Sequence, residues 1–83
     1  MTYPNSKLIT RLANAAILLA HGTFDDALPE AWQRDTVASL LETSIIRLSG
    51  DSADYNPANA QAILDYMARG EWGELLARAG ELV

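Results

Sequence analysis

The sequence predicts an all-α protein, a compact bundle of about four helices, from three observations. Apolar residues recur at the spacing of one helix face, helix start and stop signals flank each such segment, and no stretch alternates between apolar and polar residues as a strand would. A chain of 83 residues supports only one core, so we expect a single helical domain over residues 1–83. The predicted helices span residues 7–21, 29–49, 57–69 and 72–80.

The first predicted helix, residues 7–21, starts after Asn5 or Ser6 and stops at Gly22. Asparagine and serine side chains accept hydrogen bonds from the first N–H groups of a helix, and glycine adopts the left-handed conformation that ends one. The apolar residues cover an arc of about 200°, more than one packed neighbour can bury. We therefore expect this helix to lie at the centre of the bundle or at an interface. The arc comprises Leu8, Ile9, Leu12, Ala13, Ala15, Ala16, Ile17, Leu19 and Ala20.

The next two predicted helices each carry one apolar stripe, and each ends before a glycine. The helix over residues 29–49 opens with Pro29, because a first helical turn has no partner for the N–H that proline lacks. The helix over residues 57–69 opens with Asn56 as its cap, followed by proline. The expected core residues are Val37, Leu41, Ile45 and Leu48 in one helix and Ala60, Ile63, Leu64 and Met67 in the other.

The last predicted helix, residues 72–80, contains two glycines that weaken it. Its apolar residues nevertheless keep the spacing of one helix face, so we expect a short fourth helix. The residues with this spacing are Trp72, Leu75, Leu76, Ala79 and Val83.

Charge and composition exclude several classes of partner. The chain has 6 Lys and Arg residues against 11 Asp and Glu residues, a net charge of −5, so we expect no direct nucleic-acid binding. A helix-turn-helix DNA binder built on the second and third helices is disfavoured, because the third helix carries only Arg69 as a base. The longest apolar run, residues 15–20, is too short to span a membrane. The absence of cysteine favours a cytoplasmic protein over a secreted one.

No residue pattern indicates catalysis, a cofactor or a metal. His21 is the only imidazole, and we interpret it as complementing the end of the first helix. Asp51 and Asp54 lack the ligand spacing of a calcium loop, and there is no phosphate-binding or nucleophile motif. We therefore expect no enzyme activity, no cofactor and no small-molecule substrate. Three pairs with i, i+4 spacing are interpreted as stabilising their helices: Glu30 with Arg34, Asp65 with Arg69, and Glu74 with Arg78.

Three large apolar residues lie opposite the core stripes of their own helices. They are Leu18 in the first helix and Trp32 and Ile46 in the second. Single apolar residues are common on protein surfaces, but several on so small a protein favour a surface that contacts another protein or a second copy. The first prediction is therefore a non-enzymatic protein-interaction and regulatory module, homodimeric, that uses these residues as contacts.

Several acidic residues have no basic residue four positions along the helix, and their charge serves either solubility or binding. If they converge, they present a negative patch to a basic protein surface and compete with nucleic acid for it. The alternative prediction is a phage- or mobile-element-type inhibitor, anti-CRISPR-like, that blocks a nucleic-acid-handling complex in this way. The predicted partner-binding residues are Leu18, Trp32, Ile46, Asp25, Asp26, Asp35 and Glu42, and the further acids of this kind are Asp51, Asp54, Glu71 and Glu81.

Overall fold

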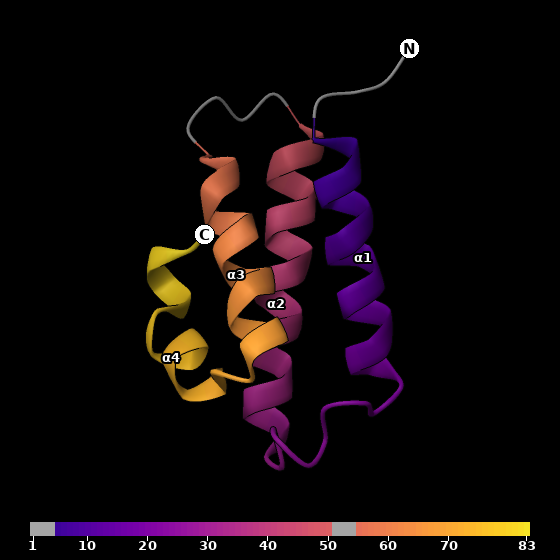
Figure 1. The fold of residues 1–83 in the computed structure, drawn as a ribbon, viewed down its shortest axis with the longest axis vertical. Coiled ribbons are helices and arrows are strands. Elements are labelled where there is room, and N and C mark those ends of the chain that lie inside the picture. Colours follow the sequence, from indigo (N-terminus) through magenta and orange to yellow (C-terminus); the bar gives the residue numbers. More distant parts are fainter. Residues whose placement is uncertain (1–4, 51–54) are drawn as a thin grey trace.

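The computed structural model describes residues 5–50 and 55–83, and it confirms the predicted all-α bundle of about four helices (Figure 1). Three longer helices run side by side, and a short helix and a single 3₁₀ turn pack beside them at the C-terminal end. The elements are α1 (Ser6–Ala20), α2 (Ala31–Ser49), α3 (Pro57–Arg69), α4 (Trp72–Ala77) and the 3₁₀ turn Ala79–Glu81.

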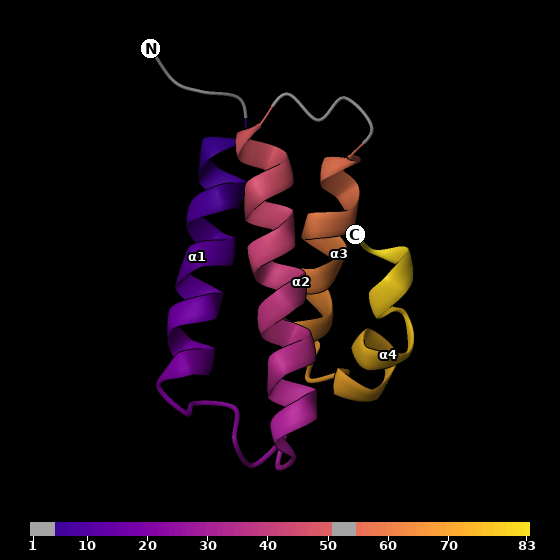
Figure 2. The same ribbon diagram turned by 180° about the vertical axis from the view of Figure 1, so that it is seen from behind.

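Helix α2 is the central element of the bundle. It contacts α1 along its length, and α3, α4 and the 3₁₀ turn also pack against it (Figures 1 and 2). The expectation that the first helix lies at the centre is therefore wrong. Although Leu12 and Leu19 of α1 are buried, Ile17 is 55% exposed, because no described element covers the outer side of α1. That side remains a candidate interface.

The core lies where α2 meets the other helices. The predicted stripe of α3 is confirmed in full, whereas in α2 the side chains of Leu40 and Ser44 are buried more deeply than those of Ile45 and Leu48. Leu28 is also fully buried, although it belongs to the connection between α1 and α2. The buried apolar residues are Leu12, Leu19, Leu28, Val37, Leu40, Leu41, Tyr55, Ala60, Ile63, Leu64, Met67, Leu75 and Leu82.

Side-chain caps explain where α2 and α3 begin. In α3 the Asn56 Oδ1 atom accepts a hydrogen bond from the Ala58 N–H at 3.0 Å, as predicted. The predicted start of α2 at Pro29 is wrong by two residues. The Glu30 N–H donates to Gln33 Oε1 at 3.0 Å, and the Glu30 carbonyl accepts the first helical hydrogen bonds, so Glu30 is the cap and the helix begins at Ala31.

The predicted fourth helix is shorter than expected. It ends at Ala77, and the chain continues after Arg78 as the tighter 3₁₀ turn. The turn directs Leu82 into the core, where it is 1% exposed, and leaves Val83 on the surface. The expectation that Val83 continues the buried face is therefore wrong. Leu82 lies seven residues after Leu75, and this spacing was the sequence signal that Leu82, rather than Val83, continues the buried face.

A buried polar contact joins α2, the start of α3 and the C-terminal end. The Tyr55 hydroxyl donates to Ser44 Oγ at 2.8 Å and lies 3.3 Å from the Leu82 carbonyl oxygen. Ser44 is fully buried, and a buried hydroxyl without a partner destabilises the folded state. Tyr55 therefore satisfies Ser44 and holds the C-terminal end against α2.

Replacing Tyr55 by phenylalanine is expected to lower the free energy of unfolding by about 1–3 kcal/mol, because the Ser44 hydroxyl then stays buried without this partner. Chemical denaturation measures this change. The control is Tyr66→Phe, which removes the hydroxyl of a half-buried residue from an exposed hydrogen bond with Arg78 and should have a smaller effect. Adding Ser44→Ala to Tyr55→Phe should restore part of the loss. Wild-type stability of Tyr55→Phe would show that the contact contributes nothing.

Candidate protein-binding surface

One side of α2 faces away from every other described element. Its centre is formed by residues that recur along one stripe, opposite the core side of the helix. Trp32 at one end is 61% exposed and Ile46 at the other is 70% exposed, so the predicted exposure of both is confirmed. We call this surface the outer α2 face, and it consists of Trp32, Asp35, Ser39, Glu42 and Ile46.

The three predicted apolar contacts do not form one patch. Trp32 and Ile46 are fourteen residues apart, about 21 Å along the helix axis, with polar residues between them. Leu18 is 47% exposed but belongs to the stripe of α1 that contains Arg11. The Arg11 Nη1 donates to Gln61 Oε1 of α3 at 3.1 Å, so this stripe faces the α3 side of the molecule. Leu18 is therefore exposed, but it lies away from the outer α2 face.

A groove between α1 and α2 brings three of the four predicted acidic residues together. It has a volume of about 340 Å³ and combines small apolar residues with charged ones. Asp25, Asp35 and Glu42 line it, whereas the exposed Asp26 does not. We call this cavity the α1–α2 groove, and its lining is Ala16, Leu19, Ala20, Gly22, Asp25, Arg34, Asp35, Ala38 and Glu42.

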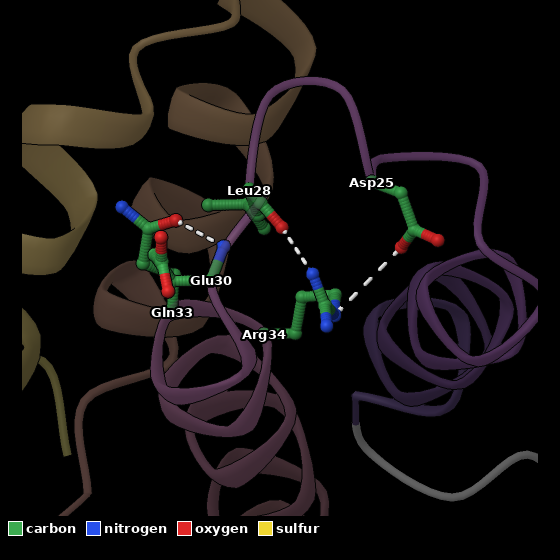
Figure 3. Close-up of polar contacts among 5 residues, drawn as sticks. All are labelled: Asp25, Leu28, Glu30, Gln33 and Arg34. Carbon is green, nitrogen blue, oxygen red and sulfur yellow. Dashed lines mark hydrogen bonds and ion pairs between the residues drawn. The ribbon is translucent and has the colours of Figure 1, made fainter.

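Arg34 forms one end of the α1–α2 groove and holds the connection between the two helices. Its Nη1 donates to the Leu28 carbonyl oxygen at 2.7 Å, and its Nε lies 3.8 Å from Asp25 Oδ1 (Figure 3). Gly22 allows the chain to leave α1 with a φ of 84°, a conformation that residues with a side chain rarely adopt. The ring of Phe24 then packs 5.0 Å from that of Trp72, so the connection also contacts α4.

The arginines pair with acids other than those expected from helical spacing. The three predicted i, i+4 pairs are absent from the ion pairs of residues 5–50 and 55–83. Each arginine instead contacts an acid in a turn or a helix end, and Asp25, Glu71 and Glu81 are therefore paired. The observed pairs are Arg34 with Asp25 at 3.8 Å, Arg69 with Glu71 at 3.2 Å, and Arg78 with Glu81 at 3.0 Å.

These pairs change which acidic charges are available for binding. Asp51 and Asp54 lie outside the described residues. Asp35 and Glu42 take part in none of the ion pairs between described residues, and both are exposed on the outer α2 face. The negative charge that can act on a partner at this surface is therefore concentrated on α2.

A second groove, which the sequence did not predict, lies on the other flank of the outer α2 face. It has a volume of about 480 Å³ and separates α2 from the C-terminal residues. Because Asp35 lines both grooves, the outer α2 face forms the ridge between them. The lining is Asp35, Thr36, Ser39, Leu40, Thr43, Ala79, Gly80 and Val83.

The described residues contain no arrangement that suggests a metal site, since no group of three or more His, Cys, Asp or Glu side chains converges among them. His21 is exposed in the turn after α1. Arg78 hydrogen-bonds Glu81 and Tyr66, and these contacts raise the pKa of its guanidinium above the ordinary value, so Arg78 remains charged. Over the same residues, no helix has both the length and the apolar character that crossing a bilayer requires.

Comparison with protein-family models, with curated proteins and with solved structures finds no match to this chain. The outer α2 face and the grooves beside it are therefore the features from which a function is inferred.

Replacing Arg34 by alanine is expected to lower the free energy of unfolding by about 1–2 kcal/mol, because the Leu28 carbonyl loses a charged donor and the connection loses its anchor. The matched control is Arg69→Ala, which removes an exposed ion pair and should cost at most about 0.5 kcal/mol. Thermal or chemical denaturation compares the two variants. Equal losses would show that Arg34 does not anchor the connection.

Proposed function

We propose that this chain is a small, non-enzymatic protein-interaction module that binds its partner through the outer α2 face. The observation that carries the proposal is the exposure of Trp32 and Ile46 on the helix against which the other elements pack. An exposed tryptophan loses contact with water when a partner covers it, and tryptophan contributes strongly to many protein interfaces. The proposed location is the cytoplasm, because the sequence lacks the cysteines typical of small secreted domains.

The packing of α2 supports this role. Its inner side is fixed by buried residues such as Val37 and Leu41, so the outer side chains project from a backbone that is already ordered. Binding to an ordered surface costs less conformational entropy than binding to a flexible segment. The outer α2 face therefore has the properties of a preformed contact surface.

Self-association is the first form of this proposal. Trp32, Ser39 and Ile46 recur every seven residues, the spacing at which side chains meet when two helices pair. The small side chain of Ser39 lies midway between the two apolar residues, which lets a second helix approach closely. A two-fold dimer uses the same face of both copies, so one exposed helix face is sufficient for it.

The second form is an inhibitor of a nucleic-acid-handling protein. The observation that favours it is the position of Asp35 and Glu42 on the α1–α2 groove. Carboxylates at this position attract a basic protein surface, and a chain bound there competes with the phosphates that the surface would otherwise contact.

Sedimentation velocity at high micromolar concentration tests self-association. We expect wild-type protein to form a dimer. Trp32→Ala or Ile46→Ala should make the free energy of dimerisation less favourable by about 2 kcal/mol, because each removes an apolar contact from the interface. Both residues are exposed, so circular dichroism and unfolding should remain close to wild type. Leu18→Ala is the matched control, exposed but away from the outer α2 face, and should dimerise normally. A strictly monomeric wild type would exclude the homodimer.

A further inference from the structure

We propose that the α1–α2 groove binds a basic amphipathic helix of a different protein, with arginine or lysine side chains seated against Asp35 and Glu42. This inference rests on the proposed interaction function and names the chemistry of the partner. It differs from self-association, which uses the apolar residues at the two ends of the outer α2 face.

The groove has the shape and composition for long basic side chains. Ala16 and Ala20 of α1 and Ala38 of α2 line it, so small methyl groups make part of its surface apolar. Arginine and lysine carry apolar stems that cover such surfaces while their charged ends remain in contact with water or with carboxylates. A basic side chain can therefore lie along the alanines and reach the acidic residues of α2.

The spacing of the carboxylates matches a helix. Asp35 and Glu42 are seven residues apart on one face of α2, about 10.5 Å along its axis. A partner helix that lies along the groove presents basic residues at the same separation when they too are seven positions apart. Each can then pair with one carboxylate, and arginine can do so through two hydrogen bonds at once.

The rest of the groove reinforces this choice of partner. Arg34 already contacts Asp25 at 3.8 Å, so this end of the groove carries a paired charge and the attraction comes mainly from Asp35 and Glu42. Ile17 follows Ala16 of the groove lining on α1, is 55% exposed, and offers an apolar contact to the same partner. A helix with basic residues on one flank and leucines on the next would satisfy both features.

The charge of the chain argues against a second copy as the occupant of this groove. Each copy has a net charge of −5, so two copies repel each other where acidic faces approach, and in self-association the apolar contacts of Trp32 and Ile46 must outweigh this repulsion. A basic helix reverses the sign of this interaction. Salt therefore separates the two modes, because screening weakens the binding of a basic helix and strengthens any contact between two copies.

Isothermal titration calorimetry with a defined peptide tests the proposal. The probe is a 15-residue acetylated and amidated helical peptide with two arginines seven positions apart, flanked by leucines. Its control is the same peptide with both arginines replaced by glutamine. We expect the arginine peptide to bind and to shift the NMR signals of Ala16, Ala20 and Ala38. The glutamine peptide should bind at least about fivefold more weakly, since it lacks two ion pairs.

Protein variants locate the binding site. Asp35→Asn combined with Glu42→Gln should lower the affinity for the arginine peptide by about fivefold, because both exposed ion pairs with the peptide are lost. The matched variant Asp65→Asn with Glu74→Gln removes the same charge from exposed positions on α3 and α4 and should bind like wild type. Equal weakening in both variants, unchanged affinity in the first, or equal binding of the two peptides would overturn the proposal.

These measurements distinguish failure of the groove proposal from failure of the proposed function. Trp32→Ala is measured by sedimentation without peptide, and the charge variants are measured by peptide affinity. Peptide that fails to bind at protein concentrations where sedimentation shows a monomer, while the Trp32-dependent dimer still forms at higher concentration, would overturn the groove alone. Peptide binding that survives in a strictly monomeric protein would support the groove and exclude only the homodimer.

Discussion

The packing around α2 determines which side chains of this protein are available to a partner. The helix buries one side against the rest of the bundle, and its opposite side remains exposed because no described element covers it. A chain of 83 residues buries a smaller share of its surface than a larger protein does. Stability and the candidate binding surface therefore depend on opposite sides of one helix, with Val37 and Leu41 inside and Trp32 and Ile46 outside.

Two polar contacts hold the segments that border the grooves beside the outer α2 face. Arg34 holds the connection from α1 through the Leu28 carbonyl, and Tyr55 holds the C-terminal end through Ser44 and Leu82. Both contacts link α2 to segments that lack long helical hydrogen-bond networks of their own. The two grooves are thus bounded by turns whose positions depend on a few specific side chains.

The sequence predicted best those features that depend on local interactions. The bounds of α3 follow from the Asn56 cap and the left-handed Gly70, and both act within a few residues, so the prediction was confirmed. The end of α4 was wrong because it depends on Leu82 packing into the core, a tertiary contact. The burial of Leu28 had no periodic signal, since it lies in a non-helical connection.

The candidate surface was predictable only in part for the same reason. Helical spacing identified Trp32 and Ile46 as exposed, because a single helix decides that property. It could not place Leu18 relative to them, nor bring Asp25 near Asp35, because both relations depend on how α1 packs against α2. The predicted i, i+4 ion pairs were wrong, because a long arginine side chain reaches an acidic residue in a nearby turn as readily as one on its own helix.

The apolar and the acidic residues of the proposed binding surface have different roles, the first in affinity and the second in the choice of partner. Trp32 and Ile46 can contribute affinity to any partner with a complementary apolar surface, including a second copy. Asp35 and Glu42 distinguish among such partners, since a basic helix gains from them and an acidic surface is repelled. Because the two acids lie between the two apolar residues along α2, a helix cannot cover both apolar residues without meeting the carboxylates. Asp35 and Glu42 therefore limit which apolar partners can bind through Trp32 and Ile46.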